Sequence, residues 1–131
     1  VSHRISLASH IGSVFIGKNC NIGAYCVIDR GSFSNTKIKD NTSLDNFVHI
    51  AHNVEIGSNN FIAGQVGIAG STLIGNNVMI GGQAGISGHL NIGNNVKIGG
   101  KSGVINNIGD NQSVMGYPAV SVKSFIKDAK K

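Results

Sequence analysis

A period of six residues is the feature that most constrains how this chain of 131 residues can fold. From residue 38 to residue 104, an aliphatic side chain recurs at every sixth position without a miss. The series is Ile38, Leu44, Ile50, Ile56, Ile62, Ile68, Ile74, Ile80, Ile86, Ile92, Ile98 and Val104. A smaller set follows it by four residues, namely Thr42, Val48, Val54, Val66, Thr72, Val78, Ala84, Val96 and Ser102, with Asn60 and Leu90 as looser members. Two inward positions in every six residues predict a short strand followed by a corner.

A longer period of eighteen residues lies on top of the first, because every third six-residue unit is similar. The units that begin at residues 56, 74 and 92 read IGSNNF, IGNNVM and IGNNVK. Three units therefore make one turn of a three-sided prism, and residues eighteen apart stack at the spacing of neighbouring strands, about 4.8 Å. The sequence predicts an all-β parallel solenoid in which each coil is stabilised mainly by its neighbours. Nineteen glycines and one proline fit a fold with many tight corners.

The same spacing extends towards the N-terminus, at Ile16, Ile22 and Ile28. Cys20 and Cys26 occupy the second inward slot of this first coil, so they are expected to be small core residues and not a disulfide or a metal pair. The step from Ile28 to Ile38 is ten residues, four more than the period. The segment GSFS, residues 31–34, is therefore predicted to be an extra loop.

The pattern changes near the C-terminus, where the six-residue phase decays after Val104. Apolar residues then recur at helical spacing, at Val122, Phe125, Ile126 and Ala129. This spacing predicts a short amphipathic helix over residues 120–129. We therefore expect a β-helix domain at residues 1–119 and a C-terminal helix with a basic tail at residues 120–131.

The formal net charge is +5, and four lysines lie within the last nine residues. This basic tail is either a solvated segment or a site of attraction for an acidic partner. Nucleic acid is not expected as a partner, because no aromatic residues interleave with the basic ones to stack on bases. Residues 1–15 contain no long apolar run, which predicts neither a signal peptide nor a transmembrane segment, and so a cytoplasmic protein. The chain opens at Val1 close to the repeats, and further residues are expected upstream of it.

Stacking by eighteens places one histidine where chemistry is possible. His52 shares a column with Gly70 and Gly88, and His89 lies one residue past that column, two coils up and so about 10 Å along the axis. Two further glycine columns precede this corner: Gly64, Gly82 and Gly100 above Asn46, and Gly67, Gly85 and Gly103 above His49. The columns are either tight corners only or a shallow groove for a linear ligand that ends near His52.

Acyl transfer from a thioester is a reaction that such a bare site can catalyse. The donor is already activated, and the leaving thiol, with a pKa of about 8.5, hardly needs a general acid. One base is enough, and histidine, with a reference pKa of about 6.5, can take the acceptor's proton near neutrality. His52 is the candidate base, and the backbone N–H of Gly70 is the candidate donor to the developing oxyanion.

Units of the form I-G-x-x-V-x with Asn-Asn corners resemble the left-handed β-helix of the hexapeptide-repeat acyltransferases, which are usually trimers. The segments IDRGSFSNTKI, LDNFVHIAHNVEIG, IAGQVGIAGS and IGGQAGISGHLNIG more closely resemble the C-terminal half of the UDP-3-O-(3-hydroxyacyl)glucosamine N-acyltransferases of lipid A biosynthesis. The similarity runs from about residue 11 to residue 119, and D-R-G, A-H-N and S-G-H are its most specific elements. The left hand is implied by this resemblance and not by the spacing.

The resemblance implies a set of site residues and partners. His52 would be the general base, and Asp45 would assist or orient it. His89 would contribute to the pantetheine or oxyanion region, and the Gly70 amide would face the carbonyl. The donor groove would include Asn46, Gly64, Gly82 and Gly88. The donor would be a 3-hydroxyacyl chain on the 4′-phosphopantetheine arm of acyl carrier protein, an acidic partner that suits the basic tail. The acceptor would be a UDP-sugar lipid precursor, the assembly would be a homotrimer, and no metal or tightly bound cofactor is implied.

Other functions stay open from the sequence. A related acyl- or acetyltransferase would use coenzyme A and another sugar. A zinc enzyme of the same prism, such as a gamma-type carbonic anhydrase, would need three histidines from two subunits, and the H-x-x-x-x-H spacing of that family is absent here. A purely structural solenoid is also possible. The N-acyltransferases normally carry an N-terminal domain that helps to hold the uracil, and we expect this chain to be a fragment or a reduced relative. His49 is expected to be a neighbour without a role.

Overall fold

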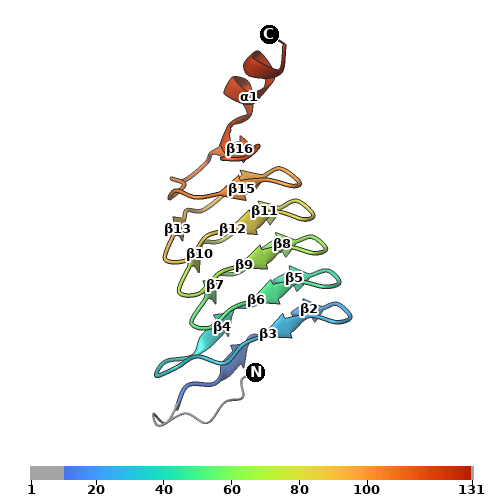
Figure 1. Cartoon of the computed structure of the whole chain (residues 1–131). Coiled ribbons are helices and arrows are strands. Elements are labelled where there is room, and N and C mark those ends of the chain that lie inside the picture. The colour runs from blue at the N-terminus through green and yellow to red at the C-terminus, as the bar shows by residue number, and fades with distance from the viewer. Residues whose placement is uncertain (1–10, 131) are drawn as a thin grey trace.

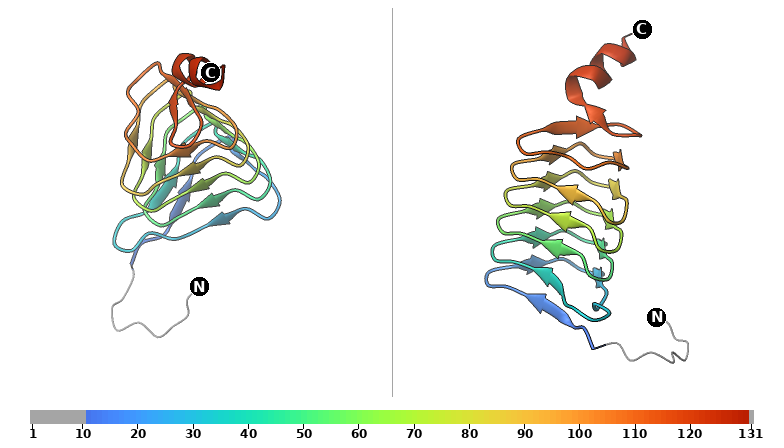
Figure 2. Two further views of the ribbon diagram at one scale, coloured as in Figure 1. Left: turned by 45° about the horizontal axis from the view of Figure 1, so that its top comes forward. Right: turned by 90° about the vertical axis from the view of Figure 1, so that its left-hand side faces the viewer.

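A computed structural model of the protein describes residues 11–130, so residues 1–10 of the expected β-helix domain, and residue 131, lie outside the described part. The chain forms the left-handed parallel β-helix expected from the sequence, with coils of three short strands stacked along one axis (Figure 1). A view tilted towards the axis shows the three-sided outline of the prism (Figure 2). Each turn of the chain therefore rests on the turn before it.

Three sheets form the faces of the prism within the described residues. Sheet A contains β1 (Val14–Ile16), β4 (Thr36–Ile38), β7 (Glu55–Ile56), β10 (Leu73–Ile74) and β13 (Asn91–Ile92). Sheet B contains β2 (Asn21–Ile22), β5 (Ser43–Leu44), β8 (Phe61–Ile62), β11 (Met79–Ile80), β14 (Lys97–Ile98), β16 (Ser113–Met115) and β17 (Val120–Ser121). Sheet C contains β3 (Val27–Ile28), β6 (His49–Ile50), β9 (Gly67–Ile68), β12 (Gly85–Ile86) and β15 (Gly103–Val104). Each regular coil therefore turns at an A–B corner, a B–C corner and a C–A corner.

The register between coils confirms the eighteen-residue period in the middle of the chain. Ile50 pairs with Ile68, and Ile68 pairs with Ile86. The first coil is longer, because Ile28 pairs with Ile50, twenty-two residues further on. The four additional residues, 31–34, form the predicted extra loop between sheets C and A.

The upper end of the prism corrects one expectation, because the repeat does not decay after Val104. Ile92 forms a bridge to Ile108, and Ile98 pairs with Val114, sixteen residues further on in each case. The last coil is thus two residues shorter than the regular coils. Ile108 and Val114 still point inwards and are only 6% and 7% exposed.

The inward positions form the core that the spacing predicts. Every member of the series from Ile38 to Val104 is at most 4% exposed. Buried hydroxyl groups are hydrogen-bonded to the backbone, as at Thr42, whose Oγ1 donates to the Gly57 carbonyl at 2.9 Å. Cys20 and Cys26 are free thiols that are half-buried and pack against the core.

The corners share one backbone feature, a residue in the left-handed region at the fourth place of the six-residue unit. These residues have φ between 55° and 63°, and asparagine is frequent among them. Asparagine and glycine tolerate this conformation better than other residues do. The Asn-Asn pairs of the sequence are therefore explained by the geometry of the corners.

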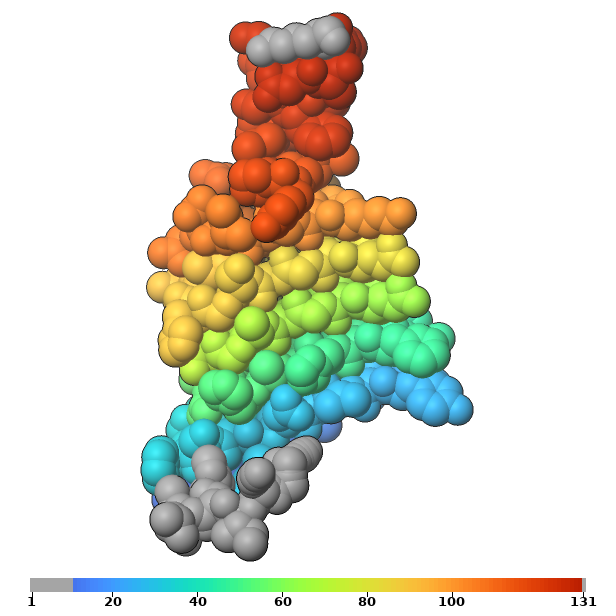
Figure 3. Space-filling view, in the orientation of Figure 1, coloured from blue at the N-terminus to red at the C-terminus, as the bar shows by residue number. Residues whose placement is uncertain are grey.

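Helix α1 (Val122–Ala129) begins two residues later than predicted, because Val120–Ser121 pairs with β16 as an antiparallel strand. The Ser121 side chain caps the helix by accepting a hydrogen bond from the N–H of Ser124. The ring of Phe125 lies against Gly116, where a β-carbon would be 2.8 Å from Cδ2. Figures 1 and 3 show the helix projecting from the end of the prism opposite to the first coil. Between residues 11 and 130, no helix is long and apolar enough to cross a membrane.

Candidate active site

His52 lies at the C–A corner between β6 and β7, and its side chain is exposed. The predicted column is confirmed, because the imidazole lies over Gly70, one coil further along the axis. A β-carbon on Gly70 would lie 2.6 Å from Cε1 of His52 and closer still to Nε2. Gly88 follows in the next coil, where a β-carbon would be 3.0 Å from the Gly70 carbonyl oxygen. Only glycine at position 70 leaves room for the imidazole.

The backbone N–H of Gly70 is available to a ligand. The N–H groups on either side of it are used within the fold, because Ala69 donates to the Ile86 carbonyl at 2.9 Å and Ser71 donates to the His52 carbonyl at 2.9 Å. The Gly70 N–H donates to no acceptor among residues 11–130. A histidine nitrogen and an unused amide donor are thus neighbours at this corner, which is the pairing that acyl transfer needs.

The outer face of sheet C beside this corner is bare. At Gly67 and Gly85, no atom lies within 4 Å of the place that a β-carbon would take. The result is a groove of about 460 Å³ lined by His49, Ala51, Gly67, Ile68, Ala69, Gly70, Gly85, Ile86 and Ser87. The ring of Tyr117 packs over Gly103 in the next strand and covers the upper part of this face.

A second groove, of about 630 Å³, follows the B–C corner. Gly64, Gly82 and Gly100 stack above Asn46, as predicted, and a β-carbon on each would lie 3.3–3.4 Å from the carbonyl oxygen one coil below. The rest of its lining is Asp45, Phe47, Gln65, Gln83 and Lys101. The N–H groups of the three glycines make no hydrogen bond within the described part of the chain. This corner therefore offers a row of backbone donors that no side chain covers.

The sequence predicted one groove over both glycine columns that ends near His52, and the described residues instead form two grooves. The groove on sheet C reaches Gly70, beside His52, as predicted, whereas the glycine groove at the B–C corner does not reach His52 of the same chain. The B–C and C–A corners lie at the two ends of β6. Asp45 belongs to the B–C corner, where its Oδ1 accepts a hydrogen bond from the Asn46 N–H at 2.8 Å. Asn46 in turn accepts a hydrogen bond from the Ala24 N–H at 2.8 Å. Asp45 thus caps its own corner and makes no hydrogen bond to His52 of the same chain.

His89 lies at the C–A corner, one place past the column of His52 and two coils further on, as the spacing predicted. It is exposed, with φ of 60°, and its N–H donates to the Gly70 carbonyl at 3.0 Å. Its ring makes no hydrogen bond to any residue between 11 and 130. Across that range there is also no group of three or more His, Cys, Asp or Glu side chains placed to hold a metal ion.

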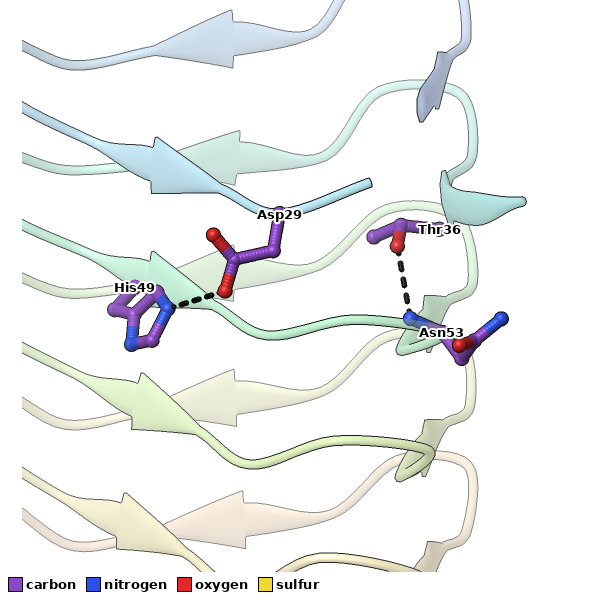
Figure 4. A network of polar contacts seen from close by, with 4 residues as sticks. All are labelled: Asp29, Thr36, His49 and Asn53. Atoms are coloured by element: carbon purple, nitrogen blue, oxygen red, sulfur yellow. Dashed lines mark hydrogen bonds and ion pairs between the residues drawn. The ribbon is translucent and has the colours of Figure 1, made fainter. Parts of the chain in front are cut away.

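Sequence reasoning missed the pairing of His49 with Asp29, which is drawn in Figure 4. The Nε2 atom of His49 lies 2.9 Å from Oδ2 of Asp29, and the two side chains are 54% and 45% exposed. A signal was present in the sequence, because the four-residue insertion sets Val27 opposite His49 and brings Asp29 close by. His49, which was expected to be a neighbour without a role, is oriented by a carboxylate where it lines the groove on sheet C.

Comparison with known proteins agrees with this architecture. Residues 35–70 match the family model described as bacterial transferase hexapeptide (six repeats). Among solved structures, the UDP-N-acetylglucosamine acyltransferase from Campylobacter jejuni superposes with a TM-score of 0.82 at 28% sequence identity. The similarity covers 86% of this chain and 46% of that chain.

Two proteins with similar sequences are both UDP-3-O-acylglucosamine N-acyltransferases by name. UDP-3-O-acylglucosamine N-acyltransferase 2 from Legionella pneumophila is 47% identical over 118 residues, which is 90% of this chain and 34% of the relative. UDP-3-O-acylglucosamine N-acyltransferase from Maricaulis maris is 54% identical over 48 residues, 37% of this chain and 14% of the relative. The chain therefore spans about a third or less of the length of these curated relatives.

Proposed function

Because this chain is a hexapeptide-repeat protein and a homologue of the UDP-3-O-acylglucosamine N-acyltransferases, we propose that it catalyses N-acyl transfer in lipid A synthesis. The proposed acceptor is the 2-amino group of a UDP-3-O-acylglucosamine, and the proposed donor is a 3-hydroxyacyl thioester of acyl carrier protein in the cytoplasm. One observation carries the proposal. At the C–A corner, Nε2 of His52 lies against Gly70, whose N–H has no hydrogen-bond partner among residues 11–130.

In the proposed reaction, His52 acts as the general base. The amine attacks the thioester carbonyl, so that a C–N bond forms while a proton passes from nitrogen to Nε2 of His52. The carbonyl oxygen becomes negatively charged and accepts a hydrogen bond from the Gly70 N–H. Collapse of this intermediate breaks the C–S bond, and the departing thiolate takes the proton from His52. The products are an amide and a free thiol, and the histidine is neutral again.

The glycine columns are the proposed path of the donor. The 4′-phosphopantetheine arm is a linear chain with amide carbonyls, and the uncovered N–H groups of Gly64 and Gly82 are donors of the kind that such carbonyls accept. Asn46 lies at the lower end of this groove. Gly88 and His89 are proposed to line the donor's path on the His52 side, because they lie at the same corner further along the axis.

The proposed site needs more than one copy of the chain. The groove with Asp45 and the corner with His52 lie at opposite edges of sheet C, so no single chain brings them together. We propose a homotrimer in which the B–C corner of one copy faces the C–A corner of the next. Asp45 of one copy would then assist His52 of its neighbour, because its negative charge stabilises the imidazolium that forms during the reaction. The exposed helix α1 and its lysines are the proposed contact with acidic acyl carrier protein.

The reaction itself is the test, with the longest native chain as the enzyme. Incubation with 3-hydroxyacyl-acyl carrier protein and UDP-3-O-acylglucosamine should give the N-acylated product by mass spectrometry. Acetyl-coenzyme A, added as a competing donor, should not be used. Preferential use of acetyl-coenzyme A would instead support a coenzyme A-dependent acetyltransferase. Stoichiometric zinc in the purified protein, with hydration of carbon dioxide, would support an enzyme like the gamma-type carbonic anhydrases.

A further inference from the structure

The extra loop of the first coil, residues 31–34, lies against the corner that carries His52. The fold does not require this loop, because the regular coils of eighteen residues lack it. Its backbone reaches Asn53, the residue directly after His52. Asn53 is therefore the point at which the insertion in one coil meets the candidate base in the next.

Four hydrogen bonds hold Asn53 in place. Its Oδ1 accepts from the Ser32 N–H at 3.1 Å. Its Nδ2 donates to the Ser34 carbonyl at 3.1 Å and to the Ser34 hydroxyl at 2.9 Å. Its backbone N–H donates to Oγ1 of Thr36 at 2.9 Å, as Figure 4 shows, and Thr36 is fully buried. Both the main chain and the side chain of Asn53 are thus fixed by the loop and by the strand that follows it.

These partners determine which way the Asn53 amide faces. A backbone N–H can only donate and a backbone carbonyl can only accept, so the oxygen must face Ser32 and the nitrogen must face Ser34. The same oxygen lies 3.3 Å from Nδ1 of His52. Because an amide oxygen only accepts, this contact is a hydrogen bond only when the neutral His52 ring carries its proton on Nδ1. The lone pair is then on Nε2, the nitrogen that lies against Gly70.

We propose that Asn53 and the loop at residues 31–34 are a positioning device that holds the neutral His52 ring in the tautomer whose Nε2 accepts a proton. The inference rests on the proposed role of His52 as the base. It explains why the insertion, the asparagine and the histidine occur together. In the following coils the loop is absent, Ser71 and His89 take the place of Asn53, and glycines take the place of His52.

The first measurement needs no enzymatic activity. Long-range ¹H–¹⁵N spectra of the full chain with ¹⁵N-labelled histidine, recorded at about pH 8.5, distinguish a ring that carries its proton on Nδ1 from one that carries it on Nε2. The chain has five histidines, and a His52→Gln variant identifies the His52 signals. We expect the proton of His52 on Nδ1. A wild-type spectrum with the proton on Nε2 would overturn the inference without any further variant.

Variants of Asn53 then test the cause. In Asn53→Ala the Nδ1 proton should be lost from the majority tautomer, whereas Asn53→Asp, which keeps an acceptor oxygen, should retain it. Asn77→Ala is the matched control, because Asn77 has a similar φ of 57° but its side chain makes no hydrogen bond among the described residues. It should leave the His52 signals unchanged. An unchanged tautomer in Asn53→Ala, with melting that shows a folded protein, would contradict the inference.

Kinetics separate a positioning role from a purely structural one. Turnover of Asn53→Ala should fall at least about tenfold, a part of the 10²–10⁴-fold that general-base catalysis contributes, with an unchanged KM for the donor. Asn53→Asp should recover most of that loss. In a His52→Ala background, Asn53→Ala should cause no further fall, and an independent fall there would refute the positioning role. If wild-type protein shows the Nδ1 proton but transfers no acyl group, the positioning stands and the proposed function fails.

Discussion

The third place of a six-residue unit determines what each corner can bind. At the A–B corner, most residues at this place have a side chain that accepts a hydrogen bond from the corner of the coil below, as Asp40, Asn76, Asn94 and Asp110 do. The Asn76 oxygen accepts from the Ser58 N–H, and the Asn94 oxygen accepts from the Asn76 N–H, each at 2.8 Å. Glycine at the same place has no such oxygen, so the N–H groups of Gly70 and Gly82 remain available. The B–C and C–A corners can therefore donate backbone hydrogen bonds to a ligand because glycines stand where the A–B corner has asparagine or aspartate.

His52→Ala tests the base directly. His52 lies outside the inward slots of its unit, so its loss leaves no core cavity, and the free energy of unfolding should change by no more than about 0.5 kcal/mol. Turnover should fall about 10²–10⁴-fold because the proton acceptor is gone. Donor affinity should be retained, since the groove is intact. Steady-state kinetics with a melting curve measures both effects, and turnover above about a tenth of wild type would exclude His52 as the base.

Gly70→Ala tests the contact between the base and the oxyanion donor. The added β-carbon overlaps the imidazole of His52, so the ring must move away while the backbone stays in place. We expect a folded protein whose turnover is reduced more than its donor affinity. Gly109→Ala is the control, because a β-carbon there meets only the Gln112 side chain, at 3.6 Å. Equal turnover of the two variants would show that the contact between the His52 ring and Gly70 is not needed for catalysis.

At the scale of strands and corners, the repeat predicted the inward columns up to Val104 and the extra loop of the first coil, but not the shortened last coil. The aliphatic period fixes which residues face the core, because a one-residue shift would expose a buried side chain. It cannot show that a coil of sixteen residues still brings Val114 inside, since a shortened corner leaves no apolar signal. The Asp29–His49 and Asn53 contacts were also missed, because they join polar groups across the insertion, where simple stacking by eighteens fails.

Gly82→Leu tests the B–C groove as the donor's path. A β-carbon at this position is 3.4 Å from the Gly64 carbonyl oxygen, so a side chain fits on the outside and the core is not disturbed. The KM for the acyl donor should rise several-fold, while the melting temperature stays near that of the wild type. Ser58→Leu, at the same place of the A–B corner, should leave KM unchanged. An unaltered KM in Gly82→Leu would exclude this groove.

Phe125→Ala tests how α1 is held on the last coil. The ring of Phe125 lies against Gly116, and the helix has no buried residue of its own. Without the ring, α1 and β17 should exchange amide hydrogens faster, whereas strands β6 to β11 should keep wild-type protection. Solenoid coils are stabilised mainly by their nearest neighbours, so the loss should stay local. Hydrogen exchange followed by mass spectrometry measures this, and uniform loss of protection would contradict it.

At the scale of the whole molecule, the three corners of the prism carry different chemistry. The A–B corner uses its N–H groups internally, the B–C corner offers a groove with Asp45, and the C–A corner carries His52. The sequence alone could place these residues in columns, but not at opposite edges of one face. A site that uses both edges has to be assembled between chains.

Mixed assemblies test that arrangement. Sedimentation should show a trimer at micromolar concentration, and a stable monomer would contradict the site as well as the assembly. Co-expression of His52→Ala chains with Asp45→Ala chains should restore activity, because some interfaces then combine one intact His52 with one intact Asp45 from the neighbour. Each variant alone should be impaired. Failure of the mixture to exceed either parent would show that Asp45 and His52 of neighbouring chains do not form a shared site.

The stacking of coils also determines by what increments the length of each groove can change. Along the axis, both grooves advance by one strand spacing per coil, about 4.8 Å. Residues inserted into a coil form a loop at a corner, as the four residues 31–34 do, and they add nothing to the length of a groove. Only a whole additional turn would extend it. The length of ligand that a groove can hold along the axis therefore changes only in steps of one complete coil.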